Sequence, residues 1–310
     1  MFTIEKYSDK YRDDWNALVF NSHAPFLFNR DFLEHHIDKY KELSLVIFYK
    51  DEFIGIFPAS FNDNRIFSHG YLTYGGLTLR RELKTNRVIE VFKLIENKYK
   101  SLGFRFIELK LLPSFYRVTC SQSQEFALHY LGWSLIGRGL SSGLNLTQSS
   151  FSKKKARDCK RGYAFQMNNG SDSLEEIFTL INSGLKKKYS ASAAHSAKDI
   201  NNLQKIFPNN IKVFELRDQE KNLLSAAIIF LSNQVAHIQY MTLSEIGRGY
   251  RALDSLIYQI YELYRDRYEW LEFGVSTTNY GKNFNETLAT KKEEYGATPL
   301  CYDIYLKQLT

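Results

Sequence analysis

The chain has 310 residues, of which 44% are hydrophobic and 15% aromatic, a composition that excludes an intrinsically disordered protein and suits about two domains. Its formal net charge of +7 favours anionic partners, although a basic surface without such a partner fits the charge equally well. The cysteines Cys120, Cys159 and Cys301 are odd in number and far apart, which excludes a disulfide framework and a CxxC metal site.

The N-terminal sequence Met1-Phe-Thr-Ile-Glu-Lys lacks the apolar core of a signal peptide. The longest apolar run, residues 226–231, is too short to cross a bilayer. We therefore expect a soluble, cytoplasmic protein without a membrane span. The sequence contains no HExxH, Walker or GxSxG motif, and the adjacent His35 and His36 would point to different faces of a helix, so no metal site is expected.

The first half of the chain alternates patterns that are typical of helices and of strands. In chain order we predict a strand near residues 2–5, helices near 10–22 and 30–39, strands at 43–49 and 53–60, a helix at 88–102 and a strand at 104–111. The polar residues 50–52 predict a tight hairpin between the two central strands.

The second half repeats this order of elements. Helices at 174–188 and 197–206 come first, followed by strands at 211–217, 223–231 and 235–242, a helix at 250–264 and strands at 270–275 and 300–306. The repetition predicts an α/β (α+β) fold of two tandem domains, each with a mixed, mostly antiparallel sheet flanked by helices. We place the domains at residues 1–150 and 151–310, joined by a linker rich in Ser, Gly and Asn near 141–152.

Four segments carry a resemblance to a known family. They are Trp15 with Ala24-Pro25-Phe26-Leu27, the turn His69-Gly-Tyr-Leu-Thr-Tyr-Gly-Gly76, the basic run Phe151-Ser-Lys-Lys-Lys-Ala-Arg-Asp-Cys-Lys-Arg161, and Leu271-Glu-Phe-Gly274 with the helix at 285–296. In this order they resemble the FemAB-like acyltransferases, which consist of two GNAT domains in tandem. Because the chain has no long heptad insertion, it is most similar to the members that acylate nucleotide-linked amino sugars.

The resemblance implies an N-acyltransferase that uses a coenzyme A thioester as co-substrate and no metal, by direct attack of the amine in a ternary complex. We expect it to acylate a nucleotide-linked amino sugar, with dTDP-3-amino-3,6-dideoxyhexose as the first candidate, for surface polysaccharide (O-antigen) synthesis. Two alternatives stay open: an aminoacyl-tRNA-dependent transferase that modifies a peptidoglycan precursor, and an inactive GNAT-like binding module. A DNA partner is not expected, and tRNA is a partner only under the first alternative.

The segment Ser244-Glu245-Ile246-Gly247-Arg248-Gly249 matches both glycines of the GNAT diphosphate motif Gln/Arg-x-x-Gly-x-Gly/Ala, but not its leading residue. A helix that starts at residue 250 would direct unpaired backbone N–H groups at an anion, and neighbouring arginines would reinforce them. The expected coenzyme site comprises Gly247, Arg248, Gly249, Tyr250 and Arg251. A plain glycine turn that caps the helix is the structural alternative.

The resemblance further implies that two neighbouring strands splay apart and expose backbone N–H groups to the thioester carbonyl. Such amides stabilise the negative charge that develops on the carbonyl oxygen. We assign the splay to the strands 223–231 and 235–242, and the amide donors to Ile228, Ile229 and Phe230.

Polar residues on apolar strands supply the catalytic candidates. Alternation places His237 and Gln239 on one face of their strand, where both are costly unless they are satisfied. His237 is the first candidate for the proton acceptor, with Gln239 beside it, and Glu272 competes as a carboxylate that orients the amine. A core histidine bonded to a neighbouring strand and a glutamate bonded to an arginine are the structural alternatives.

A further set of residues is assigned to binding of the acceptor: Tyr71, Tyr74, Gly75, Tyr189, Ser276, Asn279, Tyr280 and Lys282. The tyrosines near position 70 could stack on a base, and the loop 276–283 is rich in hydroxyls and amides that suit a sugar. Packed tyrosines and a solvated loop are the alternatives. The basic run 153–161 could contact phosphates but is more often a solvated face, and His195 is expected to be exposed.

Overall fold

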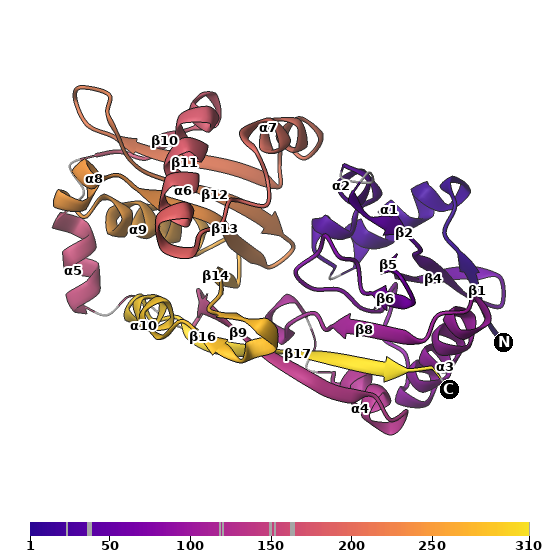
Figure 1. The fold of residues 1–310 in the computed structure, drawn as a ribbon. Helices are drawn as coiled ribbons and strands as arrows, with labels where there is room; N and C mark the ends of the chain where they lie inside the picture. Colours follow the sequence, from indigo (N-terminus) through magenta and orange to yellow (C-terminus); the bar gives the residue numbers. More distant parts are fainter. Residues whose placement is uncertain are drawn as a thin grey trace. The chain divides into compact units, whose positions relative to one another are not determined.

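The computed structural model describes residues 1–22, 24–35, 39–117, 119, 121–148, 151, 153–161 and 165–309, without the side chains of Lys153, Lys154, Arg161 and Tyr189. These residues form two compact units (Figure 1). Unit 1 consists of Met1–Leu140, Thr277–Phe284 and Leu300–Thr310, and unit 2 of Ser141–Ser276 and Asn285–Pro299. No helix among the described residues has both the length and the apolar character that a bilayer crossing requires.

Unit 1 begins with an antiparallel sheet in the order β1 (Phe2–Lys6), β3 (Leu45–Tyr49), β4 (Glu52–Phe57) and β7 (Thr78–Leu79). Lys50 and Asp51 both have positive φ between β3 and β4, which confirms the hairpin predicted there. Helix α1 (Arg12–Asn21) packs against β4, and helix α3 (Thr85–Ser101) packs against β1.

The other strands of unit 1 surround β8 (Phe106–Lys110). β17 (Thr298–Gln308) pairs with one edge of β8 in the antiparallel direction. β6 (Arg65–Phe67) pairs with the other edge of β8 in the parallel direction. β5 (Ser60–Asn62) and β2 (Lys41–Glu42) follow β6 in the sheet. The apolar faces of β6, β8, α3 and the short helix α4 (Ser123–Tyr130) share one core.

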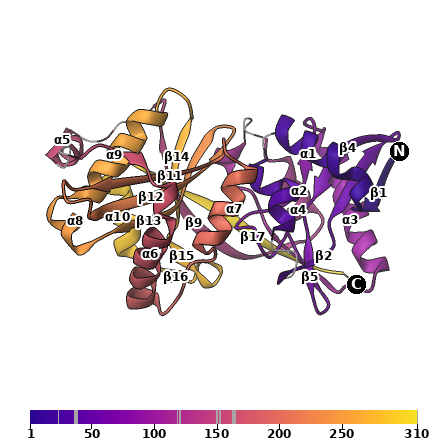
Figure 2. The same ribbon diagram turned by 90° about the horizontal axis from the view of Figure 1, so that it is seen from above.

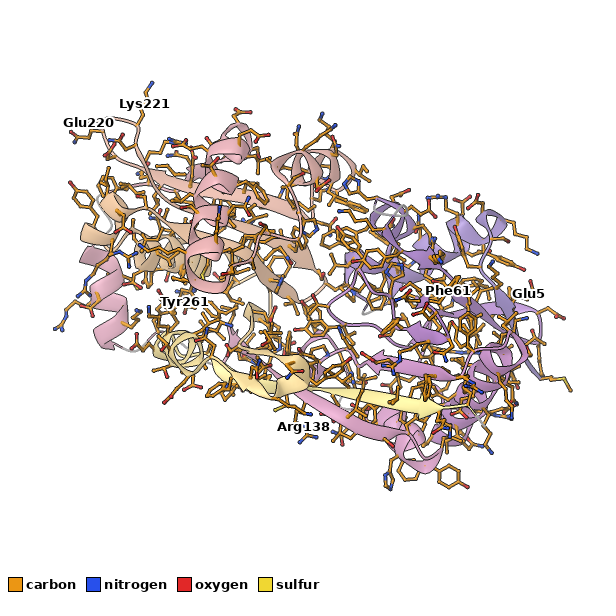
Figure 3. The ribbon with its side chains drawn as sticks, viewed as in Figure 1. Glu5, Phe61, Arg138, Glu220, Lys221 and Tyr261 are labelled. Atoms are coloured by element: carbon orange, nitrogen blue, oxygen red, sulfur yellow. The ribbon has the colours of Figure 1, made fainter. Side chains whose placement is uncertain are left out.

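Unit 2 is built on a sheet in the order β10 (Asn168–Asn169), β11 (Ile211–Arg217), β12 (Leu223–Ser232), β13 (Val235–Leu243), β14 (Trp270–Val275) and β9 (Ser134–Asn145). β13 and β14 are parallel, and the other neighbours are antiparallel. Glu220 and Lys221 mark the exposed tip of the β11–β12 hairpin (Figure 3).

Helices cover both faces of the unit 2 sheet. Helix α9 (Ala252–Tyr264) packs on β12 and β13 from one side, and α6 (Leu174–Tyr189) packs on β13 from the other (Figure 2). Unit 2 also contains the helices α5 (Lys153–Arg161), α7 (Ala197–Ile206), α8 (Glu245–Gly249) and α10 (Glu286–Glu294).

Each unit therefore has mixed, mostly antiparallel strand pairing and is flanked by helices, which confirms the predicted α/β (α+β) fold class. The strands predicted at 211–217 and 270–275 and the helix at 197–206 have the observed bounds. Apolar periodicity located them because each buries a continuous face. Helix α2 (Arg30–Glu34) ends before the expected residue 39, and residues 36–38 lie outside the described ranges.

The compact units divide the chain differently from the expected domains 1–150 and 151–310. Residues 141–145, expected in a linker, are the last part of β9 and pair with β14, for example Leu144 with Leu271. Ser141 and Ser142 are fully buried, so their small size reflects a crowded strand and not a loop. The linker prediction is wrong for these residues. At the other end of the chain, β17 pairs with β8 and thereby joins unit 1.

A buried ion cluster anchors α2 in unit 1. The Arg30 side chain is 1% exposed and contacts the carboxylates of Glu34 at 3.0 Å and Glu42 at 2.8 Å. Its guanidinium lies 3.8 Å from the ring centre of Tyr7, and His69 Nε2 lies 3.1 Å from Glu42. Burial alone would raise the pKa of Glu42, but His69 and Arg30 outweigh burial and lower that pKa from 4.5 to about 2.

We expect Glu42→Gln to destabilise the protein at neutral pH and to have a much smaller effect near pH 2. A lowered pKa contributes stability that is present above the unfolded-state pKa of 4.5 and is lost as the pH falls toward about 2. The shift corresponds to about 3 kcal/mol at neutral pH. Urea denaturation of Glu42→Gln across this pH range measures the effect, with Glu286→Gln, which changes an exposed glutamate, as the control. A pH-independent loss would contradict the assignment.

Candidate active site

Strands β13 and β14 lie side by side for three residue pairs and then separate. The pairs are Val235–Trp270, Ala236–Leu271 and His237–Glu272. Beyond them β13 continues to Leu243 and β14 to Val275 without pairing to each other. β14 bends at Gly274, whose φ is +74° and where its pairing with β9 is also interrupted. The sheet of unit 2 therefore opens between these two strands.

The predicted splay between the strands 223–231 and 235–242 is wrong. β12 and β13 pair from Ser225–Leu243 to Ser232–Val235, with one bulge. The expected amide donors Ile228, Ile229 and Phe230 are paired with β13 on one side and with β11 on the other. A strand inside a sheet has both edges occupied, so these amides cannot reach a ligand.

The backbone of β13 has an open edge beyond His237. Ser244 N donates a hydrogen bond to Leu224 O on β12 at 3.0 Å. Because successive N–H groups of a strand point to opposite edges, the amides of Met241 and Leu243 point away from β12, to the side that β14 has left. Amide donors that face such a gap can bind a carbonyl oxygen on which negative charge develops.

A cavity of about 280 Å³ lies on the α9 side of this opening. Its apolar walls come from β13, β14, α9 and α10: Met241, Leu243, Leu253, Ile257, Phe273, Leu288 and Tyr295. The cavity is lined by two acidic residues, Asp254 and Glu294. It is also lined by five cationic residues: Lys155, Arg248, Arg251, Lys291 and Lys292. Lys155 pairs with Asp254 at 3.0 Å. The cavity therefore suits an apolar chain attached to an anionic group.

The last β13–β14 pair carries a hydrogen-bonded polar cluster. His237 Nδ1 bonds one oxygen of Glu272, and Ser141 Oγ donates to the other. Gly274 N donates to that second oxygen at 3.0 Å. His237 Nε2 lies 3.0 Å from Gln239 Oε1. The structure thus joins the predicted catalytic candidates His237, Gln239 and Glu272 in one network.

Glu272 is a fully buried carboxylate. Burial alone would raise its pKa, but His237, Ser141 and Lys292 lower it below the ordinary value of 4.5. The ionised carboxylate accepts the Nδ1–H of His237 and fixes the orientation of the ring. Nε2 is then the nitrogen of His237 that can gain or lose a proton.

The polar cluster and the cavity lie on opposite faces of the sheet. Ile238 and Phe273 belong to the core under α9, and successive side chains of a strand point to opposite faces. His237 and Glu272, which precede them in sequence, therefore face the α6 side. The end of the β13–β14 pairing lies between these two faces.

The loop between β13 and α9 is not an open phosphate cradle. Ser244 caps α8: its Oγ accepts from Gly247 N at 3.0 Å, and its carbonyl accepts from Arg248 N at 3.0 Å. Arg251 N donates to Arg248 O at 3.2 Å, and α9 begins at Ala252, later than expected. The amides of Gly247, Arg248 and Arg251 are therefore bonded within the loop and are not available to a coenzyme A diphosphate. The side chains of Arg248 and Arg251 line the cavity, as do Leu253 and Asp254 in the first turn of α9.

Lys292 of α10 is a site residue that sequence reasoning missed. Its side chain is 2% exposed, and Nζ donates to Gly274 O at 2.7 Å, Val275 O at 3.0 Å and Ser276 Oγ at 2.9 Å. Burial lowers its pKa from 10.5 to about 8, against the opposing effect of Glu272. The available signal was its spacing, four residues after a leucine and three before a tyrosine, on the apolar stripe of that helix.

The predicted acceptor residues near position 70 lie in unit 1 among packed neighbours. Tyr71 stacks on Phe32 with 5.3 Å between ring centres. Tyr74 is 5% exposed, and its ring lies 5.1 Å from that of Tyr302. Gly75 bridges to the residue after β8. These contacts are those of a folded core.

The predicted loop residues are divided between the units. Ser276 belongs to unit 2, is 3% exposed and accepts from Lys292. Asn279, Tyr280 and Lys282 belong to unit 1, within the hairpin of β15 (Thr277–Thr278) and β16 (Asn283–Phe284). There the Tyr280 hydroxyl lies 3.3 Å from both carboxylate oxygens of Glu108.

The remaining candidates have separate surroundings. The side chain of Tyr189 lies outside what the structure describes. Tyr250 is 51% exposed and lies against Phe165 at 5.2 Å. His195 is 7% exposed and lies 2.8 Å from the hydroxyl of Tyr240, so the expectation of an exposed histidine is wrong. The loop after α6 folds back onto β13 and buries it.

Solved structures share this fold over nearly the whole chain. FemX has 10% identity and a TM-score of 0.68, with 96% of both chains covered. The C-terminal DUF2156 domain of a putative lysylphosphatidylglycerol synthetase from Agrobacterium fabrum has 13% identity and a TM-score of 0.63, with 96% of this chain and 91% of that chain covered. A tandem GNAT protein from the clavulanic acid pathway has 9% identity and a TM-score of 0.53, with coverage of 100% and 99%. No protein-family model and no curated protein matches the sequence.

We expect Gly247→Ala to destabilise the protein by about 1–3 kcal/mol, and Gly249→Ala to have little effect. A Cβ at Gly247 would lie 2.1 Å from Leu224 O, whereas a Cβ at Gly249 would meet no described atom within 4 Å. Denaturant unfolding of both variants measures the difference. Equal stability of the two variants would contradict the close packing of this loop on β12.

Proposed function

We propose that the chain is an acyltransferase that passes an acyl or aminoacyl group from an activated ester or thioester to an amine. The observation that supports this most directly is the opening of the sheet beyond His237 and Glu272. It offers amide donors for a carbonyl, with a cavity of about 280 Å³ on one face and a histidine–glutamate pair on the other.

In the proposed reaction the acyl chain of the donor occupies the cavity and its carbonyl enters the opening. The N–H groups of Met241 and Leu243 polarise the carbonyl oxygen, and an amide donor of this kind is typically worth about 2.7–4 kcal/mol. The neutral amine attacks the carbonyl carbon from the α6 side. Collapse of the tetrahedral intermediate breaks the C–O or C–S bond, and the alkoxide or thiolate leaves. The proton that the amine lost balances its protonation to the alcohol or thiol. Holding both reactants at one opening supplies much of the rate.

His237 is the proposed proton acceptor. Because Nδ1–H donates to the Glu272 carboxylate, Nε2 is the nitrogen that takes the proton that the amine loses. Gln239 Oε1 lies 3.0 Å from Nε2 and accepts from it when that nitrogen is protonated. Rotation of the same amide presents its NH2 group, which donates to the neutral nitrogen. The negative charge of Glu272 stabilises the imidazolium that forms.

For the substrates we propose an acyl-CoA donor and a nucleotide-linked amino sugar as acceptor, with dTDP-3-amino-3,6-dideoxyhexose as the first candidate. The resemblance of the sequence to sugar N-acyltransferases supports the acceptor. The excess of cationic over acidic side chains around the cavity supports a phosphate-bearing donor. Since the loop amides are bonded internally, Arg248 and Arg251 are the groups proposed to hold its phosphates.

An aminoacyl-tRNA donor is the second candidate. The internally bonded loop favours it, because side-chain charge alone can hold phosphodiesters without the backbone cradle that a diphosphate uses. Lys155 of the basic helix α5 lines the same cavity and adds to that charge.

Two parallel assays test the function and separate the donors. The protein is mixed with acyl-CoAs and a panel of nucleotide amino sugars, and thiol release is followed. It is also mixed with aminoacyl-tRNAs and peptidoglycan precursors, and transfer of the amino acid is followed. Amine-dependent release supports the first candidate, and transfer from tRNA supports the second. Ligand binding without turnover in either assay would contradict an enzymatic role and favour a binding module.

We expect His237→Gln to lower kcat by about 10²–10⁴, because the proton acceptor is lost. The glutamine amide can still donate to Glu272, so the buried carboxylate keeps a partner. His129→Gln, which changes an exposed histidine of α4, is the matched control. A loss of less than tenfold would demote His237 to a packing role.

A further inference from the structure

Unit 1 repeats the order of elements that builds the cavity of unit 2. In unit 2 the antiparallel neighbours β12 and β13 are followed by α9, β14 and α10. In unit 1 the antiparallel neighbours β4 and β7 are followed by α3, β8 and α4. β7 therefore corresponds to β13, and β8 corresponds to β14.

The corresponding strands of unit 1 also touch and then separate. A parallel bridge joins Gly75, just before β7, to Leu111, just after β8. Gly75 also packs closely on the residue after β6, because a Cβ at this position would lie 2.2 Å from Ser68 O. After this bridge β7 pairs with β4 in the other sheet of unit 1. The divergence of two parallel strands thus opens a gap in unit 1 as it does in unit 2.

A cavity of about 150 Å³ lies at this gap, and all the residues that line it belong to unit 1. Its apolar walls come from β7 with its flanking residues, α3 and the chain after β8: Leu77, Leu79, Leu83, Val88, Leu111 and Leu112. A cavity of this volume accommodates a group of about six carbon atoms. A short aliphatic body therefore fits between these walls.

The polar lining of this cavity is positively charged. Arg80 and Arg81 line it with side chains that are 45% and 65% exposed, and their carboxylate partner Glu52 lies at 3.6 and 4.0 Å. Glu82 also lines the cavity and accepts a hydrogen bond from Thr119. Helix α3, which follows directly, has no acidic residue in its first turn. This arrangement favours an anionic group beside the two arginines.

Gln124 of α4 supplies an acceptor that the described structure does not use. Its Nε2 donates to Leu77 O at 2.9 Å. Its Oε1 is buried and has no hydrogen-bond partner among the described residues. A buried acceptor without a donor costs stability, and a ligand that brings an N–H or O–H group removes that cost.

We propose that unit 1 binds a small amphiphilic anion in this cavity: a carboxylate or phosphate, an aliphatic body of about six carbons and one hydroxyl or amide N–H. Arg80 and Arg81 hold the anion, the leucine walls enclose the body, and Gln124 accepts from the donor group. This chemistry occurs in short 3-hydroxycarboxylates and in phosphopantetheine. The site is distinct from the acyl transfer proposed above, because every residue that it uses lies in unit 1.

Calorimetric titration of the full chain with 3-hydroxyhexanoate and, separately, with 4′-phosphopantetheine tests the proposal. We expect saturable binding of at least one of them, and the preferred ligand identifies the source of the anion. Hexanoate, which has no hydroxyl for Gln124, should bind about tenfold more weakly than 3-hydroxyhexanoate. If neither 3-hydroxyhexanoate nor 4′-phosphopantetheine binds at millimolar concentration, the proposal is overturned.

Paired variants locate the site. The double variant Arg80→Ala/Arg81→Ala should weaken binding by about tenfold or more, and because both side chains are largely exposed its circular dichroism should match the parent. Arg105→Ala, an exposed arginine of unit 1 outside the cavity, should change binding less than about twofold.

The double variant Arg248→Ala/Arg251→Ala separates this site from the cavity of unit 2. Unchanged binding by this variant supports the site in unit 1. If it loses binding and the Arg80→Ala/Arg81→Ala variant does not, the ligand occupies unit 2 and the proposal is overturned. If no acyl transfer is detected in either assay, the proposed function is contradicted. The binding measurements on unit 1 are unaffected by that result.

Discussion

The polar pair at the end of the parallel contact between β13 and β14 determines where the sheet of unit 2 opens. A fully buried carboxylate such as Glu272 persists only with charge and hydrogen-bond partners. Its partners are His237 on β13, Ser141 on β9 and the backbone N–H of Gly274 on β14 itself. These bonds hold the strands together up to this pair. Gly274, with φ of +74°, then turns β14 away, so the opening begins directly beyond the cluster.

Strand separation leaves backbone groups without their sheet partners, and Lys292 satisfies some of them. The carbonyls of Gly274 and Val275 accept from its ammonium, as buried carbonyls must find a donor somewhere. The burial that brings the ammonium there lowers its pKa to about 8. Lys292 also lines the cavity. The residue that holds the bent end of β14 is therefore part of the wall that the proposed acyl donor would contact. Stability of the opening and shape of the cavity are therefore coupled.

The sequence could predict individual residues of this site better than the contacts between them. His237 and Glu272 stand out because polar residues are rare on buried strands, but their contact depends on a parallel register between strands separated by a helix. Ser141 could not be assigned, because serine is typical of turns and loops and its neighbours in the sequence did not mark a buried strand. The motif with two glycines predicted a phosphate loop. Its one departure, Ser244, is the residue whose hydroxyl occupies the loop amide, so the mismatch carried more information than the match.

The bridge of unit 1 that corresponds by order of elements to the last β13–β14 pair of unit 2 has different residues. That pair is His237–Glu272 in unit 2 and Gly75–Leu111 in unit 1, where neither side chain can titrate. Under our proposals unit 1 recognises a ligand without a proton acceptor at the equivalent place. The two proposed tasks are nevertheless not carried by separable halves of the chain. β9 ends in unit 2 and β17 ends in unit 1, so each half of the sequence supplies the strand that completes the other unit. A chain cut at residue 150 would leave both β8 and β14 with an unpaired edge, which couples the folding of the binding unit to that of the proposed catalytic one.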